Sequence, residues 1–406
     1  MFEERCRVYD LVHRVILSLD NATDRSQQSD DMHTTAALTR RTEAYAEIDG
    51  SEDEVFQTNL YDWYISKGEG DRLLNLQSPY VVTYLQRRFE EDINIANLLW
   101  KYHSMAGNSL KAAQVQVELA SSAYDMGLNE RIEYLGRARA NASASSFGTG
   151  RQARQALLLD ITEKLDVAGI QSDILERLKE DDRLQGERKE EVVRRLDGEI
   201  QPLNTLYNQY ADQAGYYDIC LLIYQAAQHH NRTDITDTWQ SLITHTHLNC
   251  IQENRPPWEG VANMLRTLGG RLNLASNTFP INDLLPRLKK YEYEFQRGEG
   301  PETWVVDSFI EAGVEMETIF TVLVDVLYNN EAPFRAANRA YIADDVLYVA
   351  QRWFQESGRG THDLFGSEQN ARGVQDTLAN LSGSGLSKER RDDLQSLRTR
   401  IDQYLR

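Results

Sequence analysis

Amphipathic helical patterns follow one another along this chain from Leu60 to Leu405, and no segment shows the period-two alternation of a strand. Within residues 235–250, uncharged side chains recur at three- and four-residue steps: Ile235, Trp239, Leu242, Ile243, Thr246 and Cys250. The same spacing returns in residues 319–327 and 346–354. Such a chain lacks the sheet edges and strand-to-helix turns on which many small-molecule sites are built, but it offers a long continuous surface. The pattern therefore predicts partner binding and scaffolding.

Composition agrees with this fold class. Gly is 24 and Pro is 8 among 406 residues, too few for many short strands and tight turns. Hydrophobic residues make up 41% and charged residues 26%, so a substantial core can form. The formal net charge of −19 disfavours direct contact with nucleic acid or with an anionic membrane, because both carry phosphates.

The chain divides into three parts by pattern. Residues 1–19 carry a one-sided apolar stripe, which predicts the first helix, and His13 and Arg14 interrupt what would otherwise resemble a signal-peptide core. Residues 20–57 are polar and acidic at their end, so we expect an exposed, disordered loop. Residues 58–406 hold helices joined by short connections and no fixed repeat period. The predicted fold is all-α, an irregular right-handed-type α-solenoid of stacked antiparallel helices.

No pattern in the chain predicts catalysis, a metal site or a cofactor. The aspartate pairs, such as Asp181-Asp182 and Asp344-Asp345, lack the third aspartate of a D-D-x-x-D magnesium motif. The histidine clusters, His229-His230 and His245 with His247, lack the three- or four-residue spacing that places two ligands on one helix face. We therefore expect no catalytic, cofactor-binding or metal-binding residues.

Aromatic side chains provide the expected binding site. Adjacent aromatics at residues 61–64 cannot all face one core, so an exposed member would serve as an anchor for a partner. The first helix presents its own apolar stripe. We therefore expect an apolar linear peptide to dock at the N-terminal end, on Val8, Val12, Val15, Tyr61 and Tyr64. The alternative at Tyr61 is a core residue, whose loss would affect binding only through unfolding.

Four stretches in this order resemble the large non-repetitive, WGA-negative nucleoporins of the nuclear pore inner ring. The first is Leu60–Arg88, in which an aromatic helix with Leu-Tyr-x-Trp is followed by Leu-Leu, Ser-Pro and a long helix. The others are Asn97–His103, Arg131–Ala138 and Thr303–Val314. The resemblance covers nearly all the chain from residue 59 onward and identifies it with the C-terminal α-solenoid of that family.

The resemblance implies a structural scaffold of the nuclear pore complex at the nuclear envelope, which supports nucleocytoplasmic transport. The implied partners are linker nucleoporins, through short linear motifs, and other inner-ring scaffold nucleoporins. The family's β-propeller and its membrane-contact loop are missing from this sequence, so the resemblance implies no direct membrane contact by this fragment. Two alternatives remain open: an all-α enzyme whose active site follows no motif, and a membrane-coat-type solenoid.

Overall fold

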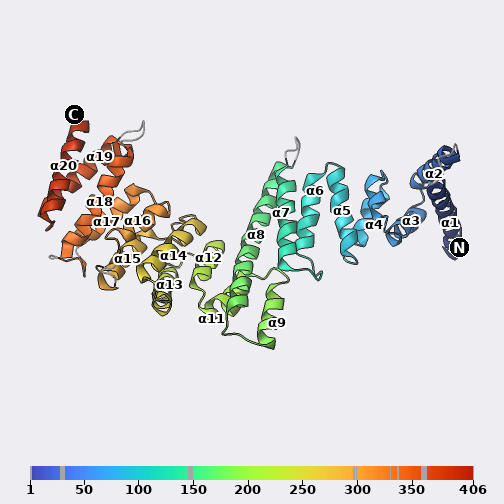
Figure 1. The fold of residues 1–406 in the computed structure, drawn as a ribbon. Helices are drawn as coiled ribbons and strands as arrows, with labels where there is room; N and C mark the ends of the chain where they lie inside the picture. Colours follow the sequence, from blue (N-terminus) through green and yellow to red (C-terminus); the bar gives the residue numbers. More distant parts are fainter. Residues whose placement is uncertain are drawn as a thin grey trace. The chain divides into compact units, whose positions relative to one another are not determined.

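The structure is a computed structural model, which describes residues 2–27, 33–144, 150–295, 298, 300–329, 331–335, 338–357 and 364–405. The chain forms two compact units, Met1–Gln201 and Pro202–Arg406. Helices make up both units, and the described residues contain no strand (Figure 1). The predicted all-α solenoid is therefore confirmed.

The first unit is a series of helices packed mainly on their sequence neighbours, and α5, α6, α7 and α8 lie side by side (Figure 1). A 3₁₀ turn, η1, separates α3 from α4. The elements are α1 (Phe2–Gln27), α2 (His33–Asp49), α3 (Glu54–Ser66), η1 (Gly70–Asn75), α4 (Tyr80–Arg87), α5 (Ile93–Met105), α6 (Ser109–Ala120), α7 (Leu128–Ser143), α8 (Arg151–Glu180) and α9 (Glu187–Leu196).

The second unit interleaves its helices, because α14 packs on α16 and α15 on α17 in addition to the sequential pairs. Its first turns are α10 (Leu203–Thr205), the π-helical η2 (Leu206–Ala211) and α11 (Asp212–Ala214). The longer elements are α12 (Tyr217–Ala226), α13 (Arg232–Gln252), α14 (Pro257–Arg271), α15 (Ile281–Phe295), α16 (Trp304–Glu311), α17 (Met316–Asn329), α18 (Arg339–Ser357), α19 (Glu368–Asn380) and α20 (Lys388–Leu405), with the short 3₁₀ turns η4 (Leu364–Gly366) and η5 (Leu381–Gly383).

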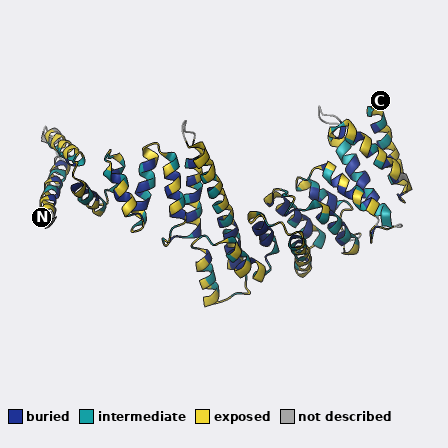
Figure 2. Cartoon of the chain, turned by 180° about the vertical axis from the view of Figure 1, so that it is seen from behind, coloured by how far each residue is buried: buried dark blue, intermediate teal, exposed yellow. Residues whose placement is uncertain are grey.

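Most helices bury one stripe and expose the opposite one, as the alternation of buried and exposed residues along the ribbons in Figure 2 shows. This is the consequence of the three- and four-residue periodicity, which gathers apolar side chains on one face of each helix. Burial of those faces between neighbouring helices supplies the main stabilisation of the fold, at roughly 25 cal/mol per Å² of apolar surface.

The structure differs from the loop expected at residues 20–57. Helix α1 continues beyond Leu19 to Gln27, and α2 fills much of the remainder; residues 28–32 lie outside the described residues. The two helices pair through polar groups, since the Asp20 carboxylate accepts hydrogen bonds from Arg41 Nε at 2.6 Å and from Tyr45 Oη at 2.8 Å. Composition pointed to a loop because these side chains are polar, whereas their pairing between helices compensates for the scarcity of apolar residues.

Three buried polar side chains fix the connections between helices. Gln57 Nε2 donates to three carbonyls at and after the end of α2, Arg131 donates to three carbonyls at and after the end of α6, and Gln171 Nε2 donates to two carbonyls at and after the end of α9. The N···O distances are 2.7–3.2 Å, and all three side chains are at most 1% exposed. Since an unpaired buried carbonyl is costly, these bonds specify where each connection lies.

Candidate partner-binding surfaces

Helix α1 carries an outward-facing apolar stripe. Val8, Leu11 and Val15 are 56%, 58% and 59% exposed, and their spacing of three and four places them on one helix face. Val12 borders this stripe, is half-buried and packs against the core, and Ile16 is 2% exposed. Of the three valines expected to bind a peptide, the structure thus presents Val8 and Val15 to solvent and turns Val12 inward. Leu11 completes the stripe, which the same spacing could have indicated.

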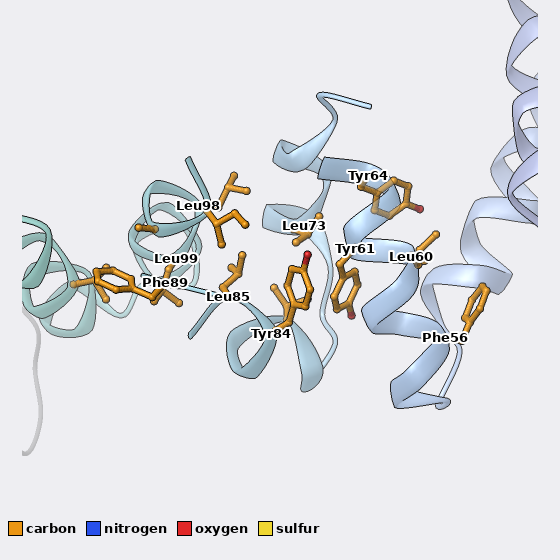
Figure 3. Packing of buried hydrophobic residues seen from close by; sticks show 14 of the residues in the cluster. Phe56, Leu60, Tyr61, Tyr64, Leu73, Tyr84, Leu85, Phe89, Leu98 and Leu99 are labelled. Carbon is orange, nitrogen blue, oxygen red and sulfur yellow. The ribbon is translucent and has the colours of Figure 1, made fainter. Parts of the chain in front are cut away.

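The two expected tyrosine anchors lie in the core. Tyr61 and Tyr64 have no exposed surface, and Figure 3 shows them on α3 among the buried residues of the first unit. The Tyr61 ring meets that of Tyr84 edge-on at 5.2 Å between centroids, and Tyr64 Oη donates to Asp49 Oδ1 at 2.9 Å. Burial, with the nearby Asp49 carboxylate, raises the pKa of Tyr64, so its hydroxyl remains a neutral donor. A partner cannot touch either ring while α3 is folded.

The reason is that α3 has packed elements on several sides. It contacts α1, η1 and α4, so aromatic side chains that diverge from α3 still enter the interior. The exposed position in the Tyr61–Tyr64 run is Asp62, and Trp63 is half-buried, stacked on His13 at 4.8 Å. The sequence argument assumed a single core face for this helix, and that assumption fails here.

Two histidines of the second unit lie within hydrogen-bond distance of neighbouring side chains. His229 Nε2 lies 2.9 Å from Asp234 Oδ2, and His247 Nδ1 lies 2.7 Å from Tyr291 Oη. Among the residues that the structure describes, no group of three or more His, Cys, Asp or Glu side chains could hold a metal ion. None of the described helices has the length and apolarity needed to cross a membrane.

A buried ionic cluster lies between α15 and α18. Lys289 is 1% exposed, forms an ion pair with Glu292, and places Nζ 2.7 Å from Asp345 Oδ2. The Tyr341 ring covers the ammonium group with its centroid 4.5 Å from Nζ. Burial raises the pKa of Asp345 to about 6, with Lys289 opposing and Glu292 adding to the shift. For Lys289, burial acts to lower the pKa, but the two carboxylates outweigh it and the pKa is raised.

The sequence places two charged residues of this cluster at positions where the helical periodicity predicts buried side chains. Lys289 and Glu292 continue the three- and four-residue series of the buried Leu285 and Leu288, so the positions were recognisably on the inner face. A charged residue on such a face is buried only when it is paired. Its partner on α18, Asp345, cannot be identified from spacing. The three charged side chains are at most 4% exposed, so they join α15 to α18 from the interior of the unit.

Open grooves lie between the helices of each unit. One groove, of about 640 Å³, is in the second unit and is bordered by the start of α13 and by the α14–α15 and α16–α17 connections. An ion pair between Arg232 and Asp283 lies at its edge. In the first unit, a groove of about 550 Å³ lies between the α3–η1 connection, α5 and α7. Grooves of this kind can receive a peptide segment, because their walls are side chains on rigid helices.

Comparisons with known proteins identify relatives of the chain. Nucleoporin NUP170 of Chaetomium thermophilum is 37% identical over 385 residues, which cover 88% of this chain and 27% of that protein. A nucleoporin of Schizosaccharomyces pombe is 36% identical over 362 residues, with the same two coverages of 88% and 27%. The chain thus spans about a quarter of the length of these relatives.

Solved structures agree over the full length. The Chaetomium thermophilum Nup170 CTD in complex with Nup145N matches with a TM-score of 0.87 and 35% identity, covering 100% of this chain and 80% of that one. The Nup170 CTD structure matches with a TM-score of 0.84 and 34% identity, covering 100% and 81%. The family model described as non-repetitive/WGA-negative nucleoporin C-terminal matches residues 1–390. The resemblance seen in the sequence is confirmed, and the chain belongs to the C-terminal family of the non-repetitive/WGA-negative nucleoporins.

Proposed function

We propose that this chain is a structural scaffold of the nuclear pore complex inner ring, located at the nuclear envelope, and that it binds short linear segments of linker nucleoporins and other scaffold nucleoporins. The observation that carries the proposal is the full-length match to a Nup170 CTD solved in complex with Nup145N. In this role the chain acts by contact and by fixed spacing, with no reaction and no cofactor.

The packing suits this role. Sequential helices from α4 to α9 contact one another, and the buried side chains Gln57, Arg131 and Gln171 hold connections of the first unit in place. A stack fixed in this way presents its surface side chains at constant distances, so a partner binds without first ordering the scaffold. Because little free energy is lost in ordering the scaffold, short segments that make few contacts each can still bind.

The exposed face of α1 is a further proposed contact. Val8, Leu11 and Val15 form an apolar stripe that can pack against an apolar surface of a neighbouring protein. Val12, Tyr61 and Tyr64 would support this helix and its surroundings from the interior. Replacing Val8 and Val15 by Ser would then weaken binding without lowering thermal stability, because both side chains are already exposed.

Two measurements test the proposed function. The full-length protein tagged with a fluorescent protein at its natural locus should form a punctate ring at the nuclear envelope; a uniform cytosolic distribution would contradict the scaffold role. The purified chain should bind purified Chaetomium thermophilum Nup145N in isothermal titration calorimetry. Absence of binding would remove linker recognition from the proposal and leave localisation to decide the scaffold role.

A further inference from the structure

One arrangement of polar side chains joins three pairs of helices in the part of the chain that the structure describes. An aspartate on one helix accepts hydrogen bonds from a tyrosine hydroxyl and an arginine guanidinium that lie four positions apart on a second helix, a set called a clasp below. The three clasps are Asp20 on α1 with Arg41 and Tyr45 on α2, Asp62 on α3 with Tyr84 and Arg88 on α4, and Asp307 on α16 with Tyr348 and Arg352 on α18.

The second and third clasps have the same hydrogen bonds. Tyr84 Oη donates to Asp62 Oδ1 at 2.6 Å, and Tyr348 Oη donates to Asp307 Oδ1 at 2.7 Å. In both, one guanidinium nitrogen donates to the same carboxylate oxygen and also to the tyrosine hydroxyl, at 2.9 Å and 3.1 Å respectively. Burial, with the bonded carboxylate, raises the pKa of Tyr84 and of Tyr348, so both hydroxyls remain protonated donors.

The sequences around these two clasps are also similar. Residues 58–68 read TNLYDWYISKG and residues 303–313 read TWVVDSFIEAG, with Thr, Asp, Ile and Gly at the same places. The two apolar positions before the aspartate and the aromatic position after it are fully buried in both, and the final glycine, Gly68 or Gly313, has a positive φ. The donor stretches are YLQRRF on α4 and YVAQRW on α18. The element between them is the short η1 in one case and the longer α17 in the other, so a search for a fixed period does not detect this recurrence.

A clasp fixes the register between two helices. Apolar contacts have little directionality, so two amphipathic helices can pack in neighbouring registers at similar energy. The tyrosine and the arginine lie one turn apart on the same helix face, and both must reach one carboxylate. A shift by one residue turns a helix by about 100°, which takes both donors away from the aspartate. Hydrogen bonds to an ionised carboxylate are also roughly twice as strong as neutral ones.

The charged groups of the clasps are accessible to water and salt. The side chains of Asp20, Asp62 and Asp307 are 18%, 48% and 25% exposed, and their arginine partners are similarly half-buried. The ion pair between Lys289 and Asp345 differs, because both of its side chains are buried. Salt screens exposed ion pairs far more than buried ones. Salt can therefore weaken the clasps while the apolar contacts between the same helices persist.

We propose that the three clasps are register locks, which open independently of one another and before the apolar contacts of the same helix pair separate. An open clasp allows its two helices to shift while they stay associated. The chain is then stiff at low salt and becomes compliant at these helix pairs as the ionic strength rises. This property belongs to the chain itself and does not depend on the partner that the scaffold binds.

Hydrogen–deuterium exchange with mass spectrometry tests the locks in the purified chain, because amide exchange reports local opening helix by helix. Raising the salt from about 0.1 M to about 1 M shortens the Debye length from about 10 Å to about 3 Å. We expect amides near the donor pairs of α2, α4 and α18 to exchange about three- to tenfold faster at high salt. Amides of α15 around Lys289 should change by less than about twofold, since that ion pair is buried.

Single substitutions remove one lock at a time. Asp62→Ala should speed exchange in α4 about tenfold at low salt and abolish the salt response there, and Asp307→Ala should do the same in α18. The other locks should be unchanged in each variant. Asp62→Asn keeps an oxygen that accepts from Tyr84 but removes the charge, so we expect a smaller rise and no salt response. Glu54→Ala is the matched control on α3: this carboxylate lies 3.6 Å from the exposed Arg87, and its loss should leave exchange in α4 within about twofold of the wild type.

Three results would overturn the proposal. Asp62→Ala could leave exchange in α4 unchanged, which would show that the clasp holds nothing. It could instead speed exchange equally in every helix of the first unit, which would make the clasp a contribution to global stability and not a separate lock. The wild-type chain could lack the salt response in α2, α4 and α18. If Asp62→Ala does not fold by circular dichroism, Asp62→Asn and the wild-type salt series decide.

Discussion

Removal of the Lys289 ammonium group tests how the second unit is held together. In Lys289→Met the side-chain length is kept, but Glu292 and Asp345 are left buried without their cation. These carboxylates are 3% and 4% exposed, so water cannot replace the lost partner without opening the contact between α15 and α18. The variant isolates the charge, because methionine fills about the same space beneath Tyr341.

The magnitude follows from this burial. Removing one partner of a buried ion pair costs about 3–5 kcal/mol, mainly because the other charge stays unpaired. The cation–π contact with Tyr341, at 4.5 Å from Nζ to the ring centroid, adds a contribution of up to about 2 kcal/mol when the site is dry. Protonation of a carboxylate relieves part of the penalty. We expect the free energy of unfolding at pH 7 to fall by about 3–5 kcal/mol.

The deficit should depend on pH, with a definite sign. In the wild type, burial raises the pKa of Asp345 to about 6, above its ordinary value of 3.8. Between these values the folded state binds more protons than the unfolded state, so this group adds stability as the pH falls and removes it as the pH rises. Without Lys289 the pKa of Asp345 rises further. Stability of the variant should therefore recover relative to the wild type between pH 7 and pH 5.5.

Urea unfolding followed by far-ultraviolet circular dichroism measures these differences. Lys290→Met is the matched control: Lys290 is 40% exposed, lies 3.8 Å from the exposed Glu331, and should cost less than about 1 kcal/mol. Adding Glu292→Gln and Asp345→Asn to Lys289→Met should restore part of the stability, since no buried charge then remains. A Lys289→Met deficit below about 1 kcal/mol that is independent of pH would refute the reasoning.

Three other predictions concern packing. Arg131→Met should lower the free energy of unfolding by about 3 kcal/mol, measured by urea unfolding, because three carbonyls lose a charged donor in the interior. Tyr61→Ala should cost about 3–5 kcal/mol and lower the melting temperature, while the folded variant binds Nup145N normally in calorimetry. Gly260→Ala should destabilise the chain, because its Cβ would clash with the buried Cys250 Sγ; Gly270→Ala in the same helix meets no atom within 4 Å and should stabilise it by about 0.5–1 kcal/mol in thermal melts.

The fold could be predicted because hydrophobic periodicity is a local property of the chain. Helix α13 shows this, since its buried Ile235, Trp239 and Cys250 are members of the predicted stripe. The α2 helix was missed because its partner groups are polar: the Asp20 contacts with Arg41 and Tyr45 join residues more than twenty positions apart. Periodicity indicates where apolar side chains lie on one helix, but it does not indicate polar pairs that form between two helices.

The same limit explains the outcome at the candidate sites. Tyr61 was expected to be an anchor because one helix was assigned one core face, whereas α3 is enclosed by α1, η1 and α4. The groove between the α3–η1 connection, α5 and α7 could not be predicted, because the hydrogen bond from Tyr134 on α7 to Asn97 on α5 forms only in the folded chain. Only the folded chain brings residues 97 and 134 together.

Polar side chains therefore carry information that the apolar stripes do not. Apolar stripes bring helices together but allow neighbouring packings of similar energy, because apolar contacts have little directionality. The hydrogen bonds from Arg131 and Gln171 are directional. Arg131 on α7 is bonded to the end of α6, and Gln171 on α8 is bonded to the end of α9. A scaffold that displays binding sites at fixed spacing needs this directional information. Substitutions at these buried polar positions should therefore alter the spacing of bound partners even in variants that remain folded.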